Sequence, residues 1–142
     1  MIAIGCDHGG YELKLEIMKY LDSKGLEYKD YGCDSLASVD YPVYGKAVAE
    51  AVAKKEADKG ILICGTGIGM SIVANKVPGV RCALLSDTFS AKATREHNDT
   101  NVMALGGRVV GPGLAVEIVD TWLNTPFSND ERHNRRIRMI EA

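Results

Sequence analysis

Short apolar runs alternate along the chain with longer segments whose apolar positions recur at helical spacing. The runs predict strands over residues 2–5, 26–31, 60–64, 80–85 and 101–105. A stripe of Leu13, Ile17 and Leu21 predicts the first helix, which Gly25 can end. Further helices are predicted over residues 40–55, 70–75 and 87–96, then around 114–122, and from about 128 to 138.

Strands separated by helices of this length indicate βαβ units and therefore a parallel sheet covered by helices on both faces. The predicted fold is a single-domain, three-layer α/β/α sandwich over residues 1–142. It has a five-stranded parallel, Rossmann-like sheet and a C-terminal helix.

The composition and net charge exclude some classes of binding partner. The chain has 142 residues, 46% of them hydrophobic and 25% charged, which is typical of a globular protein. With 17 basic and 19 acidic side chains the net charge is −2, so neither nucleic acid nor an anionic membrane is an expected partner. The four cysteines form no C-x-x-C pair, which favours reduced thiols and a cytoplasmic location.

Ligands of parallel sheets bind at the carboxyl ends of strands, which directs attention to the loop 64–69. Its glycines let backbone N–H groups converge on an anion, and Cys64 lies where a thiol can be activated. The loop lacks the last glycine of a dinucleotide fingerprint, because Met70 stands there, and it lacks a Walker lysine. A tight structural turn with a buried cysteine is the alternative.

Three other segments carry candidate chemistry. Asp7 and His8 follow the first strand; the alternative is that Asp7 caps the first helix and His8 is merely exposed. His97 opens a turn-like run, His-Asn-Asp-Thr-Asn, whose composition also suits an ordinary turn. Arg132 and Arg136 are four residues apart, so they share a helix face and can grip one phosphate; the alternative is a solvated basic terminus.

Together a thiol base, a histidine, an amide cradle and paired arginines indicate proton transfer on a small phosphorylated carbonyl compound. The chain resembles the type B ribose-5-phosphate isomerases, a family that includes allose-6-phosphate and galactose-6-phosphate isomerases. The resemblance covers essentially the whole chain, in order. The matching motifs are Gly5-Cys-Asp-His-Gly9, Asp40-Tyr-Pro42, Ile63-Cys-Gly-Thr-Gly-Ile-Gly69, Ala74-Asn-Lys76, His97-Asn-Asp-Thr-Asn101, Gly106-Gly-Arg-Val109 and Arg132-His-Asn-Arg-Arg136.

The resemblance implies a role for each matching residue. Cys64 matches the general base that moves a proton between C2 and C1 through a cis-enediolate; some members use a glutamate six residues further on, where this chain has Met70. His97 matches the proton donor that opens the furanose ring, with help from Asp7. The remaining implied contacts are the enediolate cradle of Gly65, Thr66, Gly67, Ile68 and Gly69, the sugar contacts Tyr41 and Asn98, and the phosphate contacts His8, Arg108, Arg132 and Arg136.

The resemblance also implies a homodimer or homotetramer whose site is shared between subunits, with His97, Asn98 and Arg108 facing a partner's Cys64. We expect no cofactor and no metal, since His8, His97 and His133 lie in separate segments without metal-ligand spacing. The expected reaction interconverts ribose 5-phosphate and ribulose 5-phosphate. A six-carbon substrate such as allose 6-phosphate is the alternative within the family, and a non-catalytic phosphosugar sensor is the alternative outside it.

Overall fold

The computed structural model describes residues 1–142 and contains one five-stranded parallel sheet of order β2-β1-β3-β5-β4. The strands are β1 (Ile2–Cys6), β2 (Tyr28–Asp30), β3 (Lys59–Cys64), β4 (Cys82–Leu84) and β5 (Val102–Gly106). The predicted α/β class, strand number and parallel direction are confirmed.

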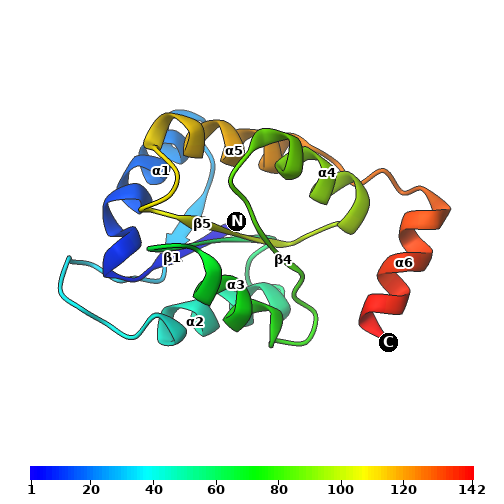
Figure 1. Cartoon of the computed structure of the whole chain (residues 1–142), viewed down its shortest axis with the longest axis horizontal. Helices are drawn as coiled ribbons and strands as arrows, with labels where there is room; N and C mark the ends of the chain where they lie inside the picture. The colour runs from blue at the N-terminus through cyan, green and yellow to red at the C-terminus, as the bar shows by residue number, and fades with distance from the viewer.

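Helices cover both faces of the sheet, as the sequence predicts (Figure 1). One face carries α1 (Tyr11–Ser23), α4 (Thr88–Asn98) and α5 (Pro112–Asn124), and the other carries α2 (Tyr41–Ala53) and α3 (Ile68–Asn75). The C-terminal helix α6 (Glu131–Glu141) extends beside the end of α4. No helix is long and apolar enough to cross a membrane.

Alternate strand residues feed two separate apolar cores, one on each face of the sheet. Ile61 and Ile63 of β3 pack in the core that also contains Trp122 of α5. Leu62 and Cys64 pack in the core that also contains Met70 of α3. Because both faces of β3 are covered, its sequence is a continuous apolar run.

Several boundaries differ from the prediction. β2 and β4 are each three residues long, and the other residues of the predicted ranges 26–31 and 80–85 lie in loops. A 3₁₀ turn (His8–Gly10) precedes α1, and α3 begins at Ile68, immediately after the left-handed residue Gly67. α6 begins at Glu131, after the N-cap Asp130, whose carboxylate accepts the N–H of Arg132.

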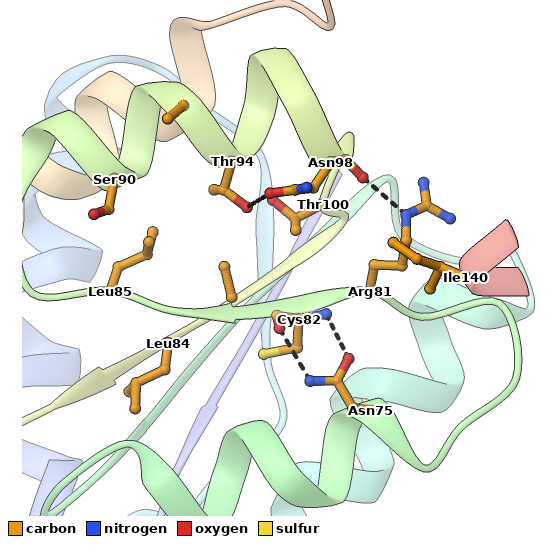
Figure 2. A pocket seen from close by; sticks show the side chains of 12 residues that line it. Asn75, Arg81, Cys82, Leu84, Leu85, Ser90, Thr94, Asn98, Thr100 and Ile140 are labelled. Carbon is orange, nitrogen blue, oxygen red and sulfur yellow. Dashed lines mark hydrogen bonds between the residues drawn. The ribbon is translucent and has the colours of Figure 1, made fainter. Parts of the chain in front are cut away.

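β4 forms one edge of the sheet, and Asn75 occupies part of that edge. Its side-chain Oδ1 accepts the N–H of Cys82 at 2.8 Å, and its Nδ2 donates to the carbonyl of Cys82 at 3.0 Å (Figure 2). The Asn75 amide therefore satisfies both backbone groups of the first β4 residue, which protects an otherwise unpaired strand edge.

The strand order also places the ligand site. β1 connects outward to β2, whereas β3 leads to β4 and β5 on the opposite side. The strand order thus reverses between β1 and β3, and ligands of open α/β sheets bind in the crevice at the carboxyl end of such a switch point. The loops that follow β1 and β3 contain Asp7–His8 and Cys64–Gly69.

Candidate active site

Cys64 is the last residue of β3, and the residue is 5% exposed. The backbone N–H of Gly67 donates to the Cys64 Sγ at 3.1 Å. The loop can turn back in this way because Gly67 adopts a positive φ of 78°, a conformation that favours glycine. An N–H that donates to sulfur interacts more strongly with a thiolate than with a thiol.

The glycine loop also presents unused backbone donors. Among residues 65–69, the Gly67 N–H is taken by Cys64, and the Ile68 N–H is taken by the Thr66 hydroxyl at 3.2 Å. The N–H groups of Gly65, Thr66 and Gly69 have no acceptor within the chain. The turn therefore offers an oxyanion several donors beside the thiol, at the N-terminus of α3.

Asp7 shapes the neighbouring loop. Its Oδ1 accepts the N–H groups of Gly9 and Gly10 at 2.9 and 3.2 Å, so the carboxylate caps the 3₁₀ turn. Asp7 is thus a capping residue, but of the 3₁₀ turn and not of α1, and no hydrogen bond of the chain uses its Oδ2. A side chain at Gly9 would place its Cβ 3.0 Å from the backbone nitrogen of Gly65, so the two loops lie in direct contact.

His8 and Tyr41 border the same loops. Val39 donates its N–H to the Nδ1 of His8 at 3.2 Å, which leaves Nε2 to carry the proton of the neutral ring. Tyr41, the first residue of α2, lies against Gly69, where a Cβ would meet its ring carbons at 2.7 Å. Gly69 therefore allows the tyrosine ring to approach the loop closely.

Arg108 lies on its own chain's side of the site, contrary to the expectation that it faces a partner's Cys64. Its N–H donates to the carbonyl of Gly65 at 2.9 Å, and Gly107 donates to the carbonyl of Cys64 at 2.8 Å. The Nη1 of Arg108 lies 3.5 Å from the ideal Cβ position of Gly65. The loop after β5 is therefore attached to the loop after β3, because the two strands pair in register at Cys64 and Gly106.

His97 and Asn98 lie elsewhere. They end α4, before β5 begins at Val102, which pairs with Gly60 at the opposite end of β3 from Cys64. The two pairs are four residue steps apart along the strands, which is roughly 13 Å at about 3.3 Å per step. In Figure 1 the end of α4 and α6 lie on the right, whereas the strands end on the left. A single chain therefore does not bring His97 to Cys64.

The arginine helix belongs to the His97 side. The rings of His97 and His133 lie 4.5 Å apart between centroids, and the Nδ1 of His133 lies 2.8 Å from the Ser128 hydroxyl. Arg132 and Arg136 are exposed on α6. Burial lowers the pKa of His133, with added repulsion from His97, Arg132 and Arg136, whereas Asp130 opposes the shift.

The other cysteines are less suited to act as bases. Burial raises the pKa of Cys6 to about 12, and Lys14 partly opposes this shift while the neighbouring Cys33, whose sulfur is 3.9 Å away, adds to it. Burial is therefore the main reason that Cys6 is a poor candidate base. Burial likewise raises the pKa of Cys82 to about 12.

A cavity of about 540 Å³ runs along the exposed edge of β4, between α3 and α4 (Figure 2). Asn98 and Thr94 line it, but Cys64 does not. The Thr94 hydroxyl donates to the Asn98 Oδ1 at 3.0 Å, which orients that amide. No group of three or more His, Cys, Asp or Glu side chains is arranged to hold a metal ion.

The sequence did not indicate the polar network that surrounds the end of α4. Arg95 contacts Thr100 from within α4 itself, but Arg81 and His133 contact Asn98 and His97 from segments far away in the chain. No spacing rule joins positions so distant in sequence. The motif His97-Asn-Asp-Thr-Asn101 was the one sequence feature that pointed to this network. In the structure, every residue of the motif after His97 makes a side-chain hydrogen bond.

Comparison with known proteins agrees with this geometry. The family model described as Ribose/Galactose Isomerase matches residues 2–140. "Putative sugar phosphate isomerase YwlF" of Bacillus subtilis is 60% identical over 140 residues, which cover 98% of this chain and 93% of that protein. "Ribose-5-phosphate isomerase B" of Escherichia coli is 51% identical over 141 residues, or 99% and 94% of the two chains.

Solved structures are similarly close. Ribose-5-phosphate isomerase B of Clostridium thermocellum superposes with a TM-score of 0.96 at 54% identity, covering 99% of this chain and 94% of that one. Ribose-5-phosphate isomerase B of Mycoplasma genitalium, solved with bound ribulose-5-phosphate, has a TM-score of 0.94 at 40% identity, with 99% and 93% covered.

Proposed function

The chain belongs to the ribose/galactose isomerase family and is a sugar phosphate isomerase of the type B ribose-5-phosphate isomerase group, and from this premise we propose that it interconverts D-ribose 5-phosphate and D-ribulose 5-phosphate. The observation that carries the proposal is the Cys64 thiol, which receives the Gly67 N–H beside the unused N–H groups of the same loop. The ribulose-5-phosphate bound to the Mycoplasma genitalium relative supports this choice of substrate.

The proposed chemistry is a proton transfer between neighbouring carbons. The Cys64 thiolate removes the C2 proton of the open-chain aldose, and the electron pair flows through the C1–C2 bond onto the carbonyl oxygen to give a cis-enediolate. Thr66 and the free N–H groups of the glycine loop stabilise the developing negative charge. The hydroxyl proton on the C2 oxygen moves to the C1 oxygen, and the Cys64 thiol returns the other proton to C1, so that the carbonyl forms at C2 and the ketose results.

Ribose 5-phosphate closes into a furanose ring in water, so the ring must open first. His97 donates a proton to the ring oxygen as the bond from that oxygen to C1 breaks, with Asp7 assisting near the same atom, and the anomeric hydroxyl loses its proton to water as it becomes the aldehyde carbonyl. Tyr41 and Asn98 contact the sugar hydroxyls. Because His97 and Asn98 lie at the opposite end of the sheet from their own Cys64, we infer that they act on the Cys64 of a second copy of this chain.

The proposed phosphate contacts, which we call the phosphate clamp, also come from two chains. His8 and Arg108 come from the chain that supplies Cys64, since both lie in the loops after β1 and β5. Arg132 and Arg136 come from the chain that supplies His97, since α6 packs beside the end of α4. The proposed enzyme is therefore at least a homodimer, and its chemistry uses no cofactor and no metal ion.

The decisive experiment measures kcat/KM of the purified protein for ribose 5-phosphate and for allose 6-phosphate. One extra carbon changes discrimination by about 1–3 kcal/mol, so the two values should differ measurably. We expect ribose 5-phosphate to give the higher value. A higher kcat/KM for allose 6-phosphate would assign the chain to six-carbon substrates, and binding without turnover of either compound would contradict the isomerase mechanism.

A further inference from the structure

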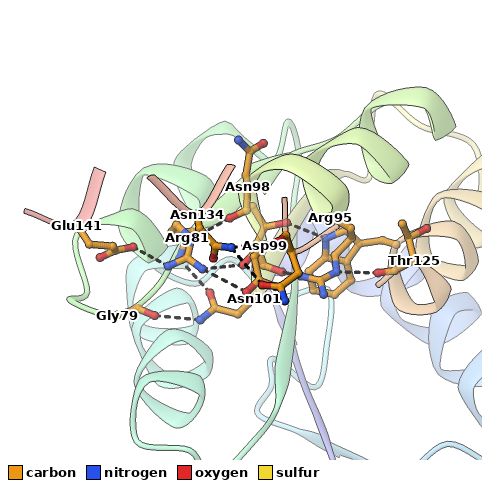
Figure 3. Close-up of polar contacts among 12 residues, drawn as sticks. Gly79, Arg81, Arg95, Asn98, Asp99, Asn101, Thr125, Asn134 and Glu141 are labelled. Carbon is orange, nitrogen blue, oxygen red and sulfur yellow. Dashed lines mark hydrogen bonds and ion pairs between the residues drawn. The ribbon is translucent and has the colours of Figure 1, made fainter. Parts of the chain in front are cut away.

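Arg81 precedes β4 at the amino end of the sheet and reaches the ends of two helices (Figure 3). Its Nε donates to the carbonyl of Asn98 at 2.9 Å, and its Nη2 donates to the carbonyl of Asp99 at 2.9 Å. Its Nη1 donates to the Oε1 of Glu141, the last residue of α6, at 2.7 Å. The side chain is 19% exposed, so these are contacts of a largely buried guanidinium.

The first two contacts fix the end of α4. The last carbonyls of a helix have no partners within the helix, and a cation beside them complements the helix dipole. The chain leaves α4 through Asp99, which has a positive φ of 45° although it is not glycine. Arg81 therefore helps hold the backbone in an uncommon conformation immediately after His97 and Asn98.

The third contact holds the far end of α6. This helix is largely exposed, with His133 as its one buried residue. His133 anchors the first turn through the His97 ring, and Glu141 anchors the last turn through Arg81. Arg136 lies between the two anchors, and Arg132 directly precedes His133.

Arg81 is itself held firmly. The Oδ1 of Asn101 accepts the backbone N–H of Arg81 at 2.9 Å, and the Nδ2 of Asn101 donates to the carbonyl of Gly79 at 2.9 Å. The carbonyl of Arg81 accepts N–H groups from Asn101 and Val102 at 3.1 and 3.3 Å. A side chain carried on so constrained a backbone can set the position of the groups it touches.

We propose that Arg81 is a positioning residue that joins the end of α4 to α6, so that His97, Asn98, Arg132 and Arg136 reach the partner subunit as one unit. This inference rests on the roles given to those four residues in the proposed function. Arg81 touches neither the sugar nor the phosphate in this scheme. It acts through the Asn98 and Asp99 carbonyls and through the Glu141 carboxylate.

The Glu141 contact provides a test in which the charge effect and the positioning effect predict opposite changes in KM. Glu141→Gln removes a negative charge near the phosphate-binding arginines, which by charge alone would lower KM for an anionic substrate. Loss of the anchor instead frees α6, so we expect KM for ribose 5-phosphate to rise by about 2- to 5-fold, as for loss of one partly exposed ion pair, with little change in kcat. A general loss of folded enzyme would lower the apparent kcat and leave KM unchanged.

Arg81→Lys is a second test variant, and Glu131→Gln is the matched control. Lysine keeps the charge but loses the planar fork that serves two carbonyls and a carboxylate, so kcat should fall and KM should rise together. Glu131→Gln makes the matched change on α6, removing the 2.9 Å pair with Arg138, and should not raise KM. Unchanged or lowered KM in Glu141→Gln, or equal rises in Glu141→Gln and Glu131→Gln, would overturn the inference. An inactive wild-type protein would instead contradict the proposed function.

Discussion

The backbone N–H of Gly67 donates to the sulfur of Cys64 at 3.1 Å, and this contact requires the positive φ of Gly67. A Cβ on Gly67 would lie 2.7 Å from the Leu84 Cδ1 and 2.8 Å from the carbonyl carbon of Leu105. The thiol and the loop are therefore placed by backbone geometry and close packing at the end of the sheet, before any substrate arrives.

Gly67→Ala should accordingly damage both stability and catalysis. The substitution adds backbone strain and a clash with the Leu105 backbone, which together should lower the free energy of unfolding by about 1–3 kcal/mol. Gly79→Ala is the matched control, because Gly79 also has a positive φ, of 89°, but no atom lies within 4 Å of its Cβ position. Chemical denaturation should show the larger loss of unfolding free energy for Gly67→Ala, and kcat should also fall further in that variant. Equal losses in the two variants would contradict the close packing of Gly67 as the cause.

Cys64→Ala should remove nearly all turnover while sugar phosphate still binds. Loss of a general base typically costs about 10²–10⁴ in rate, whereas Cys6→Ala should cost far less, because burial holds the pKa of Cys6 at about 12. Iodoacetamide should inactivate the wild type by modifying residue 64, and substrate should protect it. A Cys64→Ala variant that keeps more than about a tenth of wild-type kcat would pass the proton-transfer role to Asp7 or another carboxylate.

Arg136→Lys tests the phosphate clamp. Lysine keeps the charge but loses the bidentate fork, so KM for ribose 5-phosphate should rise while the melting temperature stays close to that of the wild type, since Arg136 is exposed. Unphosphorylated ribose should be a much poorer substrate for the wild type, because phosphate binding energy orients the reacting carbons. Unchanged kinetics in Arg136→Lys would place the phosphate elsewhere.

The docking of α6 should weaken in mild acid. The pKa of His133 is lowered in the folded protein, mainly by burial, so its contribution to stability is present above the unfolded pKa of about 6.5 and is lost as pH falls through the lower folded value. Amide hydrogen exchange in α6, corrected for intrinsic rates, should therefore increase below about pH 6.5. His133→Gln should abolish this pH dependence; the same acid response in both proteins would assign it to another group.

The fold was predictable from the sequence to a large extent, because the apolar run of β3 and the helical stripe of α1 are local patterns. The same holds for the loop 64–69, where glycines directly follow a strand. The position of Arg108 was not predictable, because it depends on the register that pairs Cys64 with Gly106. The membership of Arg81 in the α4–α6 network was equally hidden, since Glu141 lies sixty residues further along the chain.

The site could be predicted as a set of residues, but its division between chains could not be derived from local patterns. Nothing in the sequence near His97 shows that α4 ends at the edge of the sheet away from Cys64. That separation follows from the parallel direction of the strands, because each connecting helix must return the chain to the amino edge of the sheet. The resemblance implied a shared site, and the strand register supplies a physical reason for it.

One measurement tests directly whether Cys64 and His97 act across a subunit boundary. Cys64→Ala and His97→Asn chains, each inactive alone, are unfolded together in equal amounts and refolded. In a hybrid dimer one of the two sites then combines an intact Cys64 with an intact His97. Because about half of randomly paired dimers are hybrids, the mixture should recover about a quarter of the activity of the same amount of wild-type protein. Hybrid dimers that form, as native mass spectrometry would show, but recover no activity above that of the separate variants would contradict a shared site.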